Sequence, residues 1–299
     1  MIDKLEFFIT LAKEKSFSKA AEVCGVTQPT LSASIKQLED MLGVLLVNRS
    51  SRFHNLTQEG ERVLLWAKRI VADSRAMKLE IRTLREGLSG QLRIGVIPTA
   101  LGIVSALTIP YLEKHPDVQF KVLSAASNDI MEMLDNLEIE AGLTYLDNEP
   151  LGRVRAVPLC HERYQLLTVA GNPLADRQRV TWADLAAVPL GLLTPDMQNR
   201  RIIDGLMREA GGTAHAVLES NSIIALYDHV RAGRFATIMP EKLAATLGAG
   251  PPVRTIPIVE PEAVHEIGLV VPQREPIIPV VAALVAEAKK LKLEPAKTA

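Results

Sequence analysis

A short run of polar side chains between Gln28 and Gln37 has residue types that can read DNA bases. The amide of Gln28 can bridge N6 and N7 of adenine, the methyl of Thr30 can meet a thymine methyl, and the ammonium group of Lys36 can reach a phosphate or a guanine. The alternative interpretation is the solvated side of a small helical domain. The segment by itself does not separate these two interpretations.

Two short helices joined by a tight turn are expected to position these side chains. Ser18 is the predicted cap of the first helix, and Ala20, Ala21 and Val23 are expected to face inward. Gly25 provides the backbone freedom that a sharp turn between helices needs. This pattern predicts a helix-turn-helix between Ser16 and Leu46.

The second helix has a clear start, a clear end and one apolar stripe. Thr27 is its predicted N-cap, and Pro29 lies in its first turn, where a missing N–H does little harm. The apolar positions follow at spacings of 4, 3 and 4, and they are Leu31, Ile35, Leu38 and Leu42. Gly43 is expected to end the helix. The polar residues therefore occupy the opposite face.

The stretch after this helix indicates a short hairpin, or wing, from Leu45 to Leu56. Arg49, Arg52 and His54 alternate there with less polar residues, as in wings that touch the DNA backbone or the minor groove. A solvated loop is the alternative.

The whole stretch resembles the N-terminal domain of LysR-type transcriptional regulators. The family pattern of AA, a turn, QP-x-LS-x-x-I-x-x-LE, LG-x-x-L, R and LT-x-x-G is almost complete up to Gly60. Two departures are Val47, where an aromatic residue is usual, and Ala33, where a basic residue is common. The DNA-binding residues that the side chains and the resemblance together indicate are Ser18, Thr27, Gln28, Pro29, Thr30, Ser32, Ser34, Lys36, Arg49 and Arg52.

A long helix is predicted from Thr57 to about Leu88. Its apolar positions alternate at spacings of 4 and 3, and they are Val63, Ala67, Ile70, Ser74 (a polar interruption), Met77, Ile81, Leu84 and Leu88. Such a sustained heptad pattern favours a partner helix over a simple surface stripe. The resemblance implies that this helix pairs two subunits and that dimers assemble into a homotetramer, which places two recognition helices on one two-fold operator.

From Gln91 onward short apolar strands alternate with helices, which predicts a largely parallel sheet covered by helices. The expected strands are 91–97, 120–123, 141–145, 164–169, 188–193, 216–219, 236–239 and 265–271, and the expected helices are 100–112, 129–137, 182–187, 199–209, 222–231 and 278–293. The resemblance implies a two-lobed, type 2 periplasmic-binding-protein-like effector domain. The expected boundaries are 1–58 for the winged helix-turn-helix, 59–88 for the linker helix and 89–299 for the effector domain, with lobe I at 91–161 and 266–299 and lobe II at 162–265.

A small, anionic metabolite is the expected effector, bound between the lobes where strands end and helices begin. The residues that the family pattern brings to this cleft are Thr99, Ala100, Ser127, Asn128, Thr144, Thr194, Asn199, Arg200, Asn221 and Ser222. Each of them could instead cap a helix or be solvated in a loop. Arg200, or its neighbour Arg201, is the predicted cation for a carboxylate. Phe235 replaces a glycine of the family and could either crowd the cleft or fill the core.

Composition is typical of a globular protein, and it adds a small charge asymmetry. The net charge is −1, but residues 1–88 contain 14 Lys+Arg and 11 Asp+Glu, whereas the rest contains 20 and 24. The excess of positive charge therefore lies in the predicted DNA-binding part. The resemblance implies double-stranded DNA, RNA polymerase and a small co-effector as partners, with no membrane, no metal and no other cofactor expected.

Other functions receive little support. The two cysteines, Cys24 and Cys160, lack metal or disulfide spacing, and Cys24 is expected to be inert filler. Cys160, His161 and Glu162 are neighbours on a predicted strand and would point to opposite faces, so no enzyme is expected. No signal peptide or apolar run of about 18 residues is present, which indicates a cytoplasmic, nucleoid-associated protein. One alternative is a ligand-binding sensor whose N-terminal module docks a protein partner.

Overall fold

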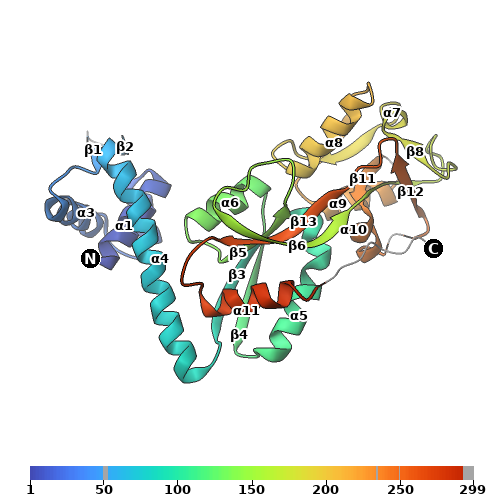
Figure 1. Cartoon of the computed structure of the whole chain (residues 1–299). Coiled ribbons are helices and arrows are strands. Elements are labelled where there is room, and N and C mark those ends of the chain that lie inside the picture. Colours follow the sequence, from blue (N-terminus) through green and yellow to red (C-terminus); the bar gives the residue numbers. More distant parts are fainter. Residues whose placement is uncertain (50–52, 234, 249, 292–299) are drawn as a thin grey trace. The chain divides into compact units, whose positions relative to one another are not determined.

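A computed structural model of the chain describes residues 1–49, 53–233, 235–248 and 250–291 (Figure 1). The chain divides into two compact units, of which one contains Met1–Leu88 and the other contains Ser89–Leu134 and Ile139–Gln273. The fold mixes helices and sheets, but they are distributed unevenly along the chain. Helices dominate the first unit, and two larger sheets form the second. No described helix is both long and apolar enough to cross a lipid bilayer.

The N-terminal unit is a winged helix-turn-helix. Its first elements are α1 (Ile2–Glu14), α2 (Phe17–Val23), α3 (Gln28–Leu42), β1 (Val47–Arg49) and β2 (Phe53–Leu56). The strands β1 and β2 pair antiparallel to form the wing. Phe8, Leu11, Leu31, Ile35 and Leu38 are fully or almost fully buried in one shared core. Burial of this apolar stripe fixes α3 with its opposite face outward.

Three details of the helix-turn-helix differ from the sequence-based expectation. Ser16, and not Ser18, caps α2, because its side chain accepts the backbone N–H of Lys19. Val23 is 64% exposed and Leu42 is 45% exposed, so neither faces the core. The buried stripe of α3 instead ends with a carboxylate, that of Glu39.

Glu39 is 5% exposed and holds the start of the wing. Its Oε1 accepts the backbone N–H groups of Leu46 at 2.9 Å and Val47 at 3.3 Å. These bonds satisfy two backbone donors that would otherwise be buried without partners. The last inward-facing side chain of α3 is therefore Glu39 and not Leu42. The chain that leaves α3 needs a hydrogen-bond acceptor for its backbone N–H groups.

The entry into the linker helix explains the glycine of the LTQEG segment. Thr57 caps this helix, because its Oγ1 accepts the N–H of Gly60 at 2.9 Å and donates to the carbonyl of Leu45 at 2.6 Å. A Cβ on Gly60 would lie 2.1 Å from the carbonyl oxygen of Leu46. Only glycine allows this close packing of the helix on the wing.

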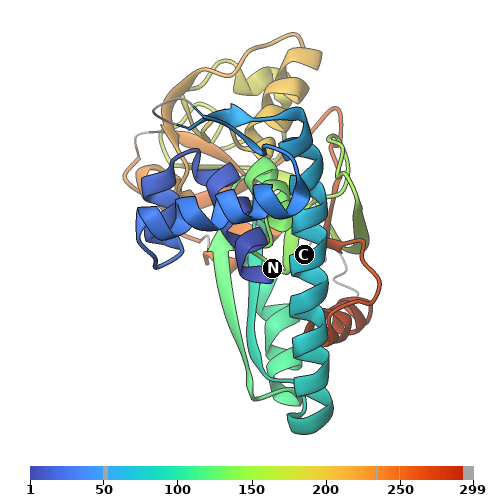
Figure 2. The same cartoon turned by 90° about the vertical axis from the view of Figure 1, so that its left-hand side faces the viewer.

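The linker helix α4 (Gln58–Glu86) has 29 residues, and α1 to α3 gather along one part of it (Figures 1 and 2). Of the predicted heptad stripe, Ala67 is buried and Val63 and Ile70 pack partly buried against the core of the N-terminal unit. Met77, Ile81 and Leu84 are instead 55%, 54% and 83% exposed. The first half of the stripe thus belongs to the intramolecular core. The second half leaves an apolar stripe at helical spacing uncovered within one chain.

Lobe I of the second unit is built on a mixed five-stranded sheet with strand order β4-β3-β5-β13-β6. Its strands are β3 (Gly90–Val96), β4 (Val118–Ser124), β5 (Ala141–Tyr145), β6 (Val154–Glu162) and β13 (His265–Pro272). Its helices are η1 (a 3₁₀ turn, Pro98–Ile103), α5 (Val104–Lys114), α6 (Ser127–Asp135) and α11 (Pro279–Ala288). The pairs β3–β4 and β3–β5 are parallel, whereas β13 is antiparallel to β5 and β6.

Lobe II is built on a six-stranded sheet with order β10-β9-β11-β7-β12-β8. Its strands are β7 (Tyr164–Val169), β8 (Val180–Thr181), β9 (Leu190–Leu193), β10 (Ala216–Ser220), β11 (Ala236–Pro240) and β12 (Val253–Val259). Its helices are α7 (Trp182–Leu185), α8 (Gln198–Glu209), α9 (Ile223–Arg231) and α10 (Glu241–Thr246). Two crossings connect the lobes, from β6 to β7 and from β12 to β13.

The sheets are less parallel than the alternating pattern predicts, because β13 runs antiparallel to β5 and β6, and β7 runs antiparallel to β11 and β12. The strands β6, β8 and β12 and the helix α10 are elements that the sequence pattern does not predict. The predicted helix 100–112 is divided into η1 and α5. The predicted helix 278–293 ends at Ala288, and its last two positions lie outside the described residues. Antiparallel returns of this kind are needed because the chain crosses between the lobes twice.

Candidate DNA-binding helix and effector pocket

The polar face of α3 lies on the surface, opposite its buried stripe. Gln28, Pro29, Thr30 and Lys36 are exposed, and Ser32 and Ser34 are half-buried. The exposed set contains amide, hydroxyl and ammonium groups at the N-terminal half of the helix, where base-reading side chains of helix-turn-helix proteins lie. The backbone N–H groups of the first turn add a site for phosphate.

Local hydrogen bonds preorganise part of this face. Thr27 caps α3 by accepting the N–H of Thr30 at 3.3 Å, and the two threonine hydroxyls lie 2.8 Å apart. Ser18 Oγ donates to Gln28 Oε1 at 2.8 Å. Ser18 therefore orients the Gln28 amide so that its NH₂ group remains available for a base or a phosphate.

The wing residues are only partly described. Arg49 lies at the end of β1, and Arg52 lies outside the described residues. Val47, which stands where the family usually has an aromatic side chain, is 1% exposed and packs in the core of the N-terminal unit. The smaller side chain therefore leaves the wing well packed.

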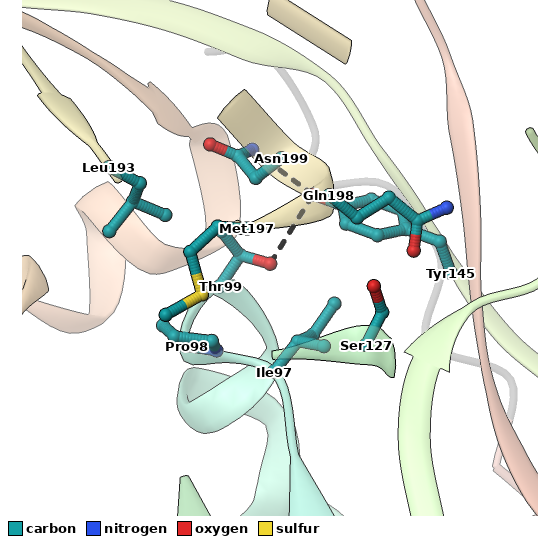
Figure 3. A pocket seen from close by; sticks show the side chains of 9 residues that line it. All are labelled: Ile97, Pro98, Thr99, Ser127, Tyr145, Leu193, Met197, Gln198 and Asn199. Atoms are coloured by element: carbon teal, nitrogen blue, oxygen red, sulfur yellow. Dashed lines mark hydrogen bonds between the residues drawn. The ribbon is translucent and has the colours of Figure 1, made fainter. Parts of the chain in front are cut away.

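A small pocket lies where the two lobes meet (Figure 3). Its polar lining comes from Thr99, Ser127, Tyr145, Gln198 and Asn199, and its apolar lining comes from Ile97, Pro98, Leu193 and Met197. It contains about 200 Å³ of space not filled by atoms, with open solvent at its mouth included. The cavity volume open to a water molecule is only about 10 Å³, which is room for about one water, so the pocket is nearly closed in this arrangement.

Three helical segments begin at this pocket: η1 from lobe I, α6 from lobe I and α8 from lobe II. The first N–H groups of each have no partner within their own helix, and they carry partial positive charge. Ser127 and Asn199, which are 4% exposed, lie in the first turns of α6 and α8. The pocket therefore presents hydrogen-bond donors from both lobes.

The hydroxyl of Tyr145 is the centre of the polar contacts beside this pocket (Figure 3). It donates to Glu162 Oε1 at 2.5 Å and accepts from Asn199 Nδ2 at 3.1 Å, and Thr99 Oγ1 lies 3.3 Å away. Burial raises the pKa of Tyr145 well above 10, so the phenol is neutral. One hydroxyl thus links β5, β6, η1 and α8.

Glu162 is a buried carboxyl group that accepts a hydrogen bond from Tyr145. Burial raises its pKa from the ordinary 4.5 to about 7, and the hydrogen bond from Tyr145 opposes this rise. The hydroxyl of the nearby Tyr164 is buried and has no hydrogen-bond partner among the described residues. A carboxyl group near half-ionisation at neutral pH therefore lies directly behind the pocket.

Gln198 and Arg201, in the first turns of α8, form four further hydrogen bonds with lobe I. Gln198 Nε2 donates to the carbonyl of Asp147 at 3.1 Å, and Arg201 forms a two-pronged ion pair with Glu149 at 2.7 and 2.9 Å. Arg201 Nη2 also lies 3.5 Å from Ser127 Oγ. These contacts hold the lobes together beside the pocket.

Arg200 points elsewhere, although the sequence predicts it as the cation for the effector. Its Nε lies 3.0 Å from both carboxylate oxygens of Asp204, and its Nη1 donates to Glu219 at 2.7 Å and to the carbonyl of Leu193 at 2.9 Å. All of these partners belong to lobe II. Arg201 is therefore the arginine near the pocket, because consecutive helical side chains point about 100° apart.

The structure brings Thr99, Ser127 and Asn199 of the predicted effector residues to the pocket, and it places the others apart. Ala100 lines a neighbouring pocket, and Asn128 is exposed at the start of α6. Thr144 and Thr194 have buried hydroxyls without partners in the described part, but neither lines the pocket. The remaining two lie on the lobe II surface at the start of α9, where Asn221 is exposed and Ser222 is the helix cap.

Sequence reasoning misses Tyr145, Glu162, Met197 and Gln198. The family pattern points to Thr144 in the AGLTY strand, one residue before Tyr145. Glu162 stands out in the sequence only as part of a Cys-His-Glu triplet. Phe235 does not line the pocket, since its ring stacks on His229 with centroids 6.1 Å apart.

A second pocket shares Thr99 with the first and lies on the Glu162 side. It is lined by Thr99, Ala100, Ile103, Cys160, His161, Glu162 and Ile267 of lobe I and by Pro240 and Lys242 of lobe II, with about 250 Å³ of unfilled space. Burial raises the pKa of the Cys160 thiol, and the charge of Lys242 opposes this rise. Among the described residues, no group of three His, Cys, Asp or Glu side chains converges as a metal site.

Comparison with known proteins identifies both units. Residues 2–61 match the family "Bacterial regulatory helix-turn-helix protein, lysR family", and residues 85–292 match the "LysR substrate binding domain". The chain is 31% identical over 270 residues to "DNA-binding transcriptional dual regulator OxyR" of Escherichia coli K12, covering 90% of this chain and 88% of that protein. A probable nitrogen assimilation transcriptional activator of Synechococcus elongatus is 26% identical, covering 93% and 91%.

Solved structures share the fold along the full chain. A full-length variant of OxyR from Pseudomonas aeruginosa has a TM-score of 0.71 at 24% identity and covers 97% of this chain and 94% of that one. Full-length CbnR in complex with its target DNA has a TM-score of 0.63 at 22% identity and covers 97% and 99%. Both family models and the E. coli relative support a regulator that binds DNA through its helix-turn-helix and an effector through its C-terminal domain, and they give no support to a protein-docking sensor. The chain therefore belongs to the LysR family of bacterial transcriptional regulators.

Proposed function

We propose that α3 reads the bases of a two-fold operator and that the wing contacts the backbone beside it. The observation that carries this proposal is the exposed polar face of α3 above a fully buried apolar face. In this assignment Gln28, Thr30 and Ser32 contact base edges, and Lys36 contacts a phosphate. Arg49 and Arg52 of the wing contact the backbone or the minor groove.

The assembly proposed is a homodimer through α4, and two such dimers form a tetramer. The uncovered stripe of Met77, Ile81 and Leu84 supports pairing with a second copy, because an exposed apolar stripe at coiled-coil spacing is costly in water. The functional division at 1–58, 59–88 and 89–299 belongs to this proposal. Recruitment of RNA polymerase and a cytoplasmic, nucleoid-associated location are also parts of this proposal.

The effector proposed is a small anion that binds in the pocket between the lobes. N–H groups at the starts of α6 and α8, together with Ser127, Thr99 and Asn199, offer hydrogen bonds to acceptor atoms without a cation in direct contact. Arg201 lies beside Ser127 at the rim, where its ion pair with Glu149 holds the two lobes together.

Binding would act by a shift between lobe arrangements, not by catalysis. An effector that contacts both lobes binds better to the arrangement in which α6 and α8 are close, and it shifts the population toward that arrangement. Its free energy of binding is thereby coupled to the geometry of the oligomer on DNA. No residue near the pocket is assigned a catalytic role.

Peroxide sensing is not carried over from relatives named hydrogen peroxide-inducible genes activators. The residues that line the pocket include Met197 and Gln198 and no cysteine. Cys160 is buried with a raised pKa, which lowers its thiolate fraction, and Cys24 lies in the turn of the N-terminal unit. We therefore propose reversible, non-covalent binding of the effector.

The deciding experiment is binding of the purified protein to the DNA upstream of its own gene, with excess random DNA and at two salt concentrations. Binding that survives the competitor and weakens with salt is expected of a sequence-specific regulator. A folded, dimeric protein that selects no fragment from a genome-wide library would contradict the proposal. The selected fragment then serves to screen small anions for an effect on the complex.

A further inference from the structure

Glu162 lies in the hinge between the two lobes. It is the last residue of β6 in lobe I, and the chain enters lobe II at Tyr164, two residues later. Its cross-strand partner is His265, where the second crossing re-enters lobe I. An ionisable side chain thus occupies the point about which the lobes would move relative to each other.

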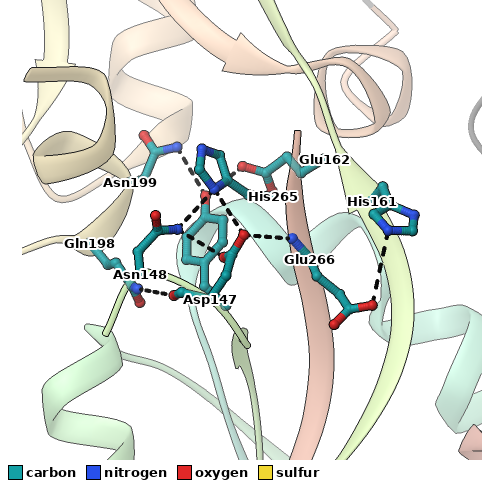
Figure 4. Close-up of polar contacts among 9 residues, drawn as sticks. Asp147, Asn148, His161, Glu162, Gln198, Asn199, His265 and Glu266 are labelled. Atoms are coloured by element: carbon teal, nitrogen blue, oxygen red, sulfur yellow. Dashed lines mark hydrogen bonds and ion pairs between the residues drawn. The ribbon is translucent and has the colours of Figure 1, made fainter. Parts of the chain in front are cut away.

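Glu162 lies beside both pockets at the lobe interface, near His265 and Asn199 (Figure 4). Tyr145, which donates to Glu162, lines the effector pocket, and Glu162 itself lines the second pocket together with Lys242 of lobe II. Glu162 is 6% exposed, and elements of both lobes cover it. Separation of the lobes would therefore admit water to the carboxyl group from either side.

Polar groups from several elements surround the carboxyl group. Its hydrogen-bond donor is Tyr145, and its own strand continues to Tyr164 in lobe II. The other titratable groups and polar partners around it are Asp147, Cys160, His161, Asn199, Lys242, His265, Glu266 and Thr99. Lys242 contacts the Cys160 thiol. Asp147 lies 3.1 Å from Nδ1 of His265, and His161 lies 4.0 Å from Glu266 (Figure 4).

We propose that Glu162 is a proton-linked hinge residue: opening of the lobes hydrates its carboxylate and releases a proton, so the closed arrangement is favoured at acidic pH and opening at neutral and alkaline pH. The proposal deepens the proposed function, because it rests on lobe closure as the effector-binding state. It adds that the unliganded equilibrium between closed and open lobes is set by the protonation of one buried group.

The size of the effect follows from linkage. The carboxyl group has a pKa of about 7 when buried and an ordinary value near 4.5 when hydrated, so the open state loses its proton first as pH rises. The closed-to-open equilibrium constant should rise about thirtyfold between pH 5.5 and pH 8.5 and level off above neutral pH. A histidine switch would have the opposite sign, since burial penalises its protonated form.

Cys160 offers a reporter within the same interface. It is 7% exposed and lines the second pocket beside Glu162, so separation of the lobes should expose its thiol. We would measure the rate of its reaction with a thiol reagent from pH 5.5 to 8.5 in the full chain carrying Cys24→Ser. Each rate is divided by that of the same variant unfolded in urea, which removes the pH dependence of thiolate formation.

The expected result is a protection factor that falls about thirtyfold with rising pH and is flat when Glu162→Gln is added. His265→Gln serves as the matched control and should retain the pH dependence. Asp147→Asn removes a nearby charge that contributes to the raised pKa of Glu162, so it should retain the dependence with a smaller amplitude. The proposal is overturned if the protection factor of the Cys24→Ser chain does not change with pH. It is also overturned if the pH dependence disappears with His265→Gln but remains with Glu162→Gln. If Glu162→Gln does not fold, the Cys24→Ser chain alone tests the proposal. Its protection factor must fall with rising pH and level off above neutral pH. DNA binding is measured separately, so failure here is distinct from failure of the regulator assignment.

Discussion

The phenolic oxygen of Tyr145 accepts a hydrogen bond from the side-chain amide of Asn199 over 3.1 Å, which joins the end of β5 in lobe I to the first turn of α8 in lobe II. The same hydroxyl donates its proton to Glu162. Hydrogen bonds in such a chain polarise one another, so donation to a carboxylate makes the oxygen a better acceptor for Asn199. The hydrogen bond between the lobes therefore depends on the buried side chain of Glu162.

Removal of this hydroxyl should destabilise the effector domain. Tyr145→Phe leaves Glu162 buried without its donor, which is expected to cost about 1–3 kcal/mol of unfolding free energy. The loss should be larger at pH 8 than at pH 5, because the ionised carboxylate depends more on the donor. Urea unfolding at both pH values measures it. Tyr227→Phe, on the half-buried α9 tyrosine, is the matched control and should change stability by less than about 1 kcal/mol.

The pH dependence of stability should change when Glu162 cannot ionise. Its pKa is raised by burial to about 7 in the folded chain, so the unfolded chain releases this proton first as pH rises. Stability should therefore fall between about pH 4.5 and 7 and then level off, with a total effect of up to about 3 kcal/mol.

Glu162→Gln is expected to abolish this fall and to be more stable than the natural chain at pH 8, with little difference at pH 4.5. Thermal unfolding followed by Trp182, with Trp66→Phe to remove the exposed indole, makes the comparison. A variant that is less stable than the natural chain at pH 8 would contradict the assigned desolvation of Glu162.

Arg200 is expected to stabilise lobe II, whereas Arg201 is expected to connect the two lobes. Arg200→Met leaves Asp204 and Glu219 without their shared partner and should cost about 2 kcal/mol of stability, with little change in effector affinity. Arg201→Met removes the ion pair with Glu149 across the lobes and should weaken effector binding several-fold. Calorimetric titration of each folded variant with the identified anion distinguishes them, and equal losses of affinity would refute the distinction.

Two residues of α3 should affect DNA binding in different ways. Lys36→Gln is expected to weaken binding by a similar factor for every DNA sequence and to reduce the salt slope by about 1. Thr30→Ala should change the preference at one base position by about 1–3 kcal/mol. Binding to a panel of operator variants tests both, with Lys121→Gln on the exposed edge of β4 as the control. Identical behaviour of the two variants would contradict their roles.

The uncovered stripe of α4 should hold the dimer together. Leu84→Glu places a charge on a residue that is 83% exposed in one chain, so the monomer should remain folded while association weakens at least tenfold. Arg82→Glu lies on the opposite side of the same helix and should leave the dimer intact. Sedimentation at several concentrations measures both. An unchanged dimer in Leu84→Glu would place the interface elsewhere.

The sequence by itself determined the elements whose rules are local. Thr27, Gly43 and Thr57 mark helix ends through bonds to residues three or four positions away, and the structure has these caps where the sequence predicts them. The stripe of Leu31, Ile35 and Leu38 likewise predicts the buried face of α3. Such signals are readable because helical neighbours are close in sequence.

Only the tertiary structure decided which polar groups meet. Glu162 faces Tyr145 because β6 and β5 both pair with β13, and no spacing in the sequence encodes that neighbourhood. Ser16 caps α2 in place of the equally suitable Ser18, and Arg200 turns to Asp204 and Glu219 while Arg201 reaches lobe I. Packing chooses among locally equivalent residues, because burial and long-range hydrogen bonds differ by more free energy than their local preferences do.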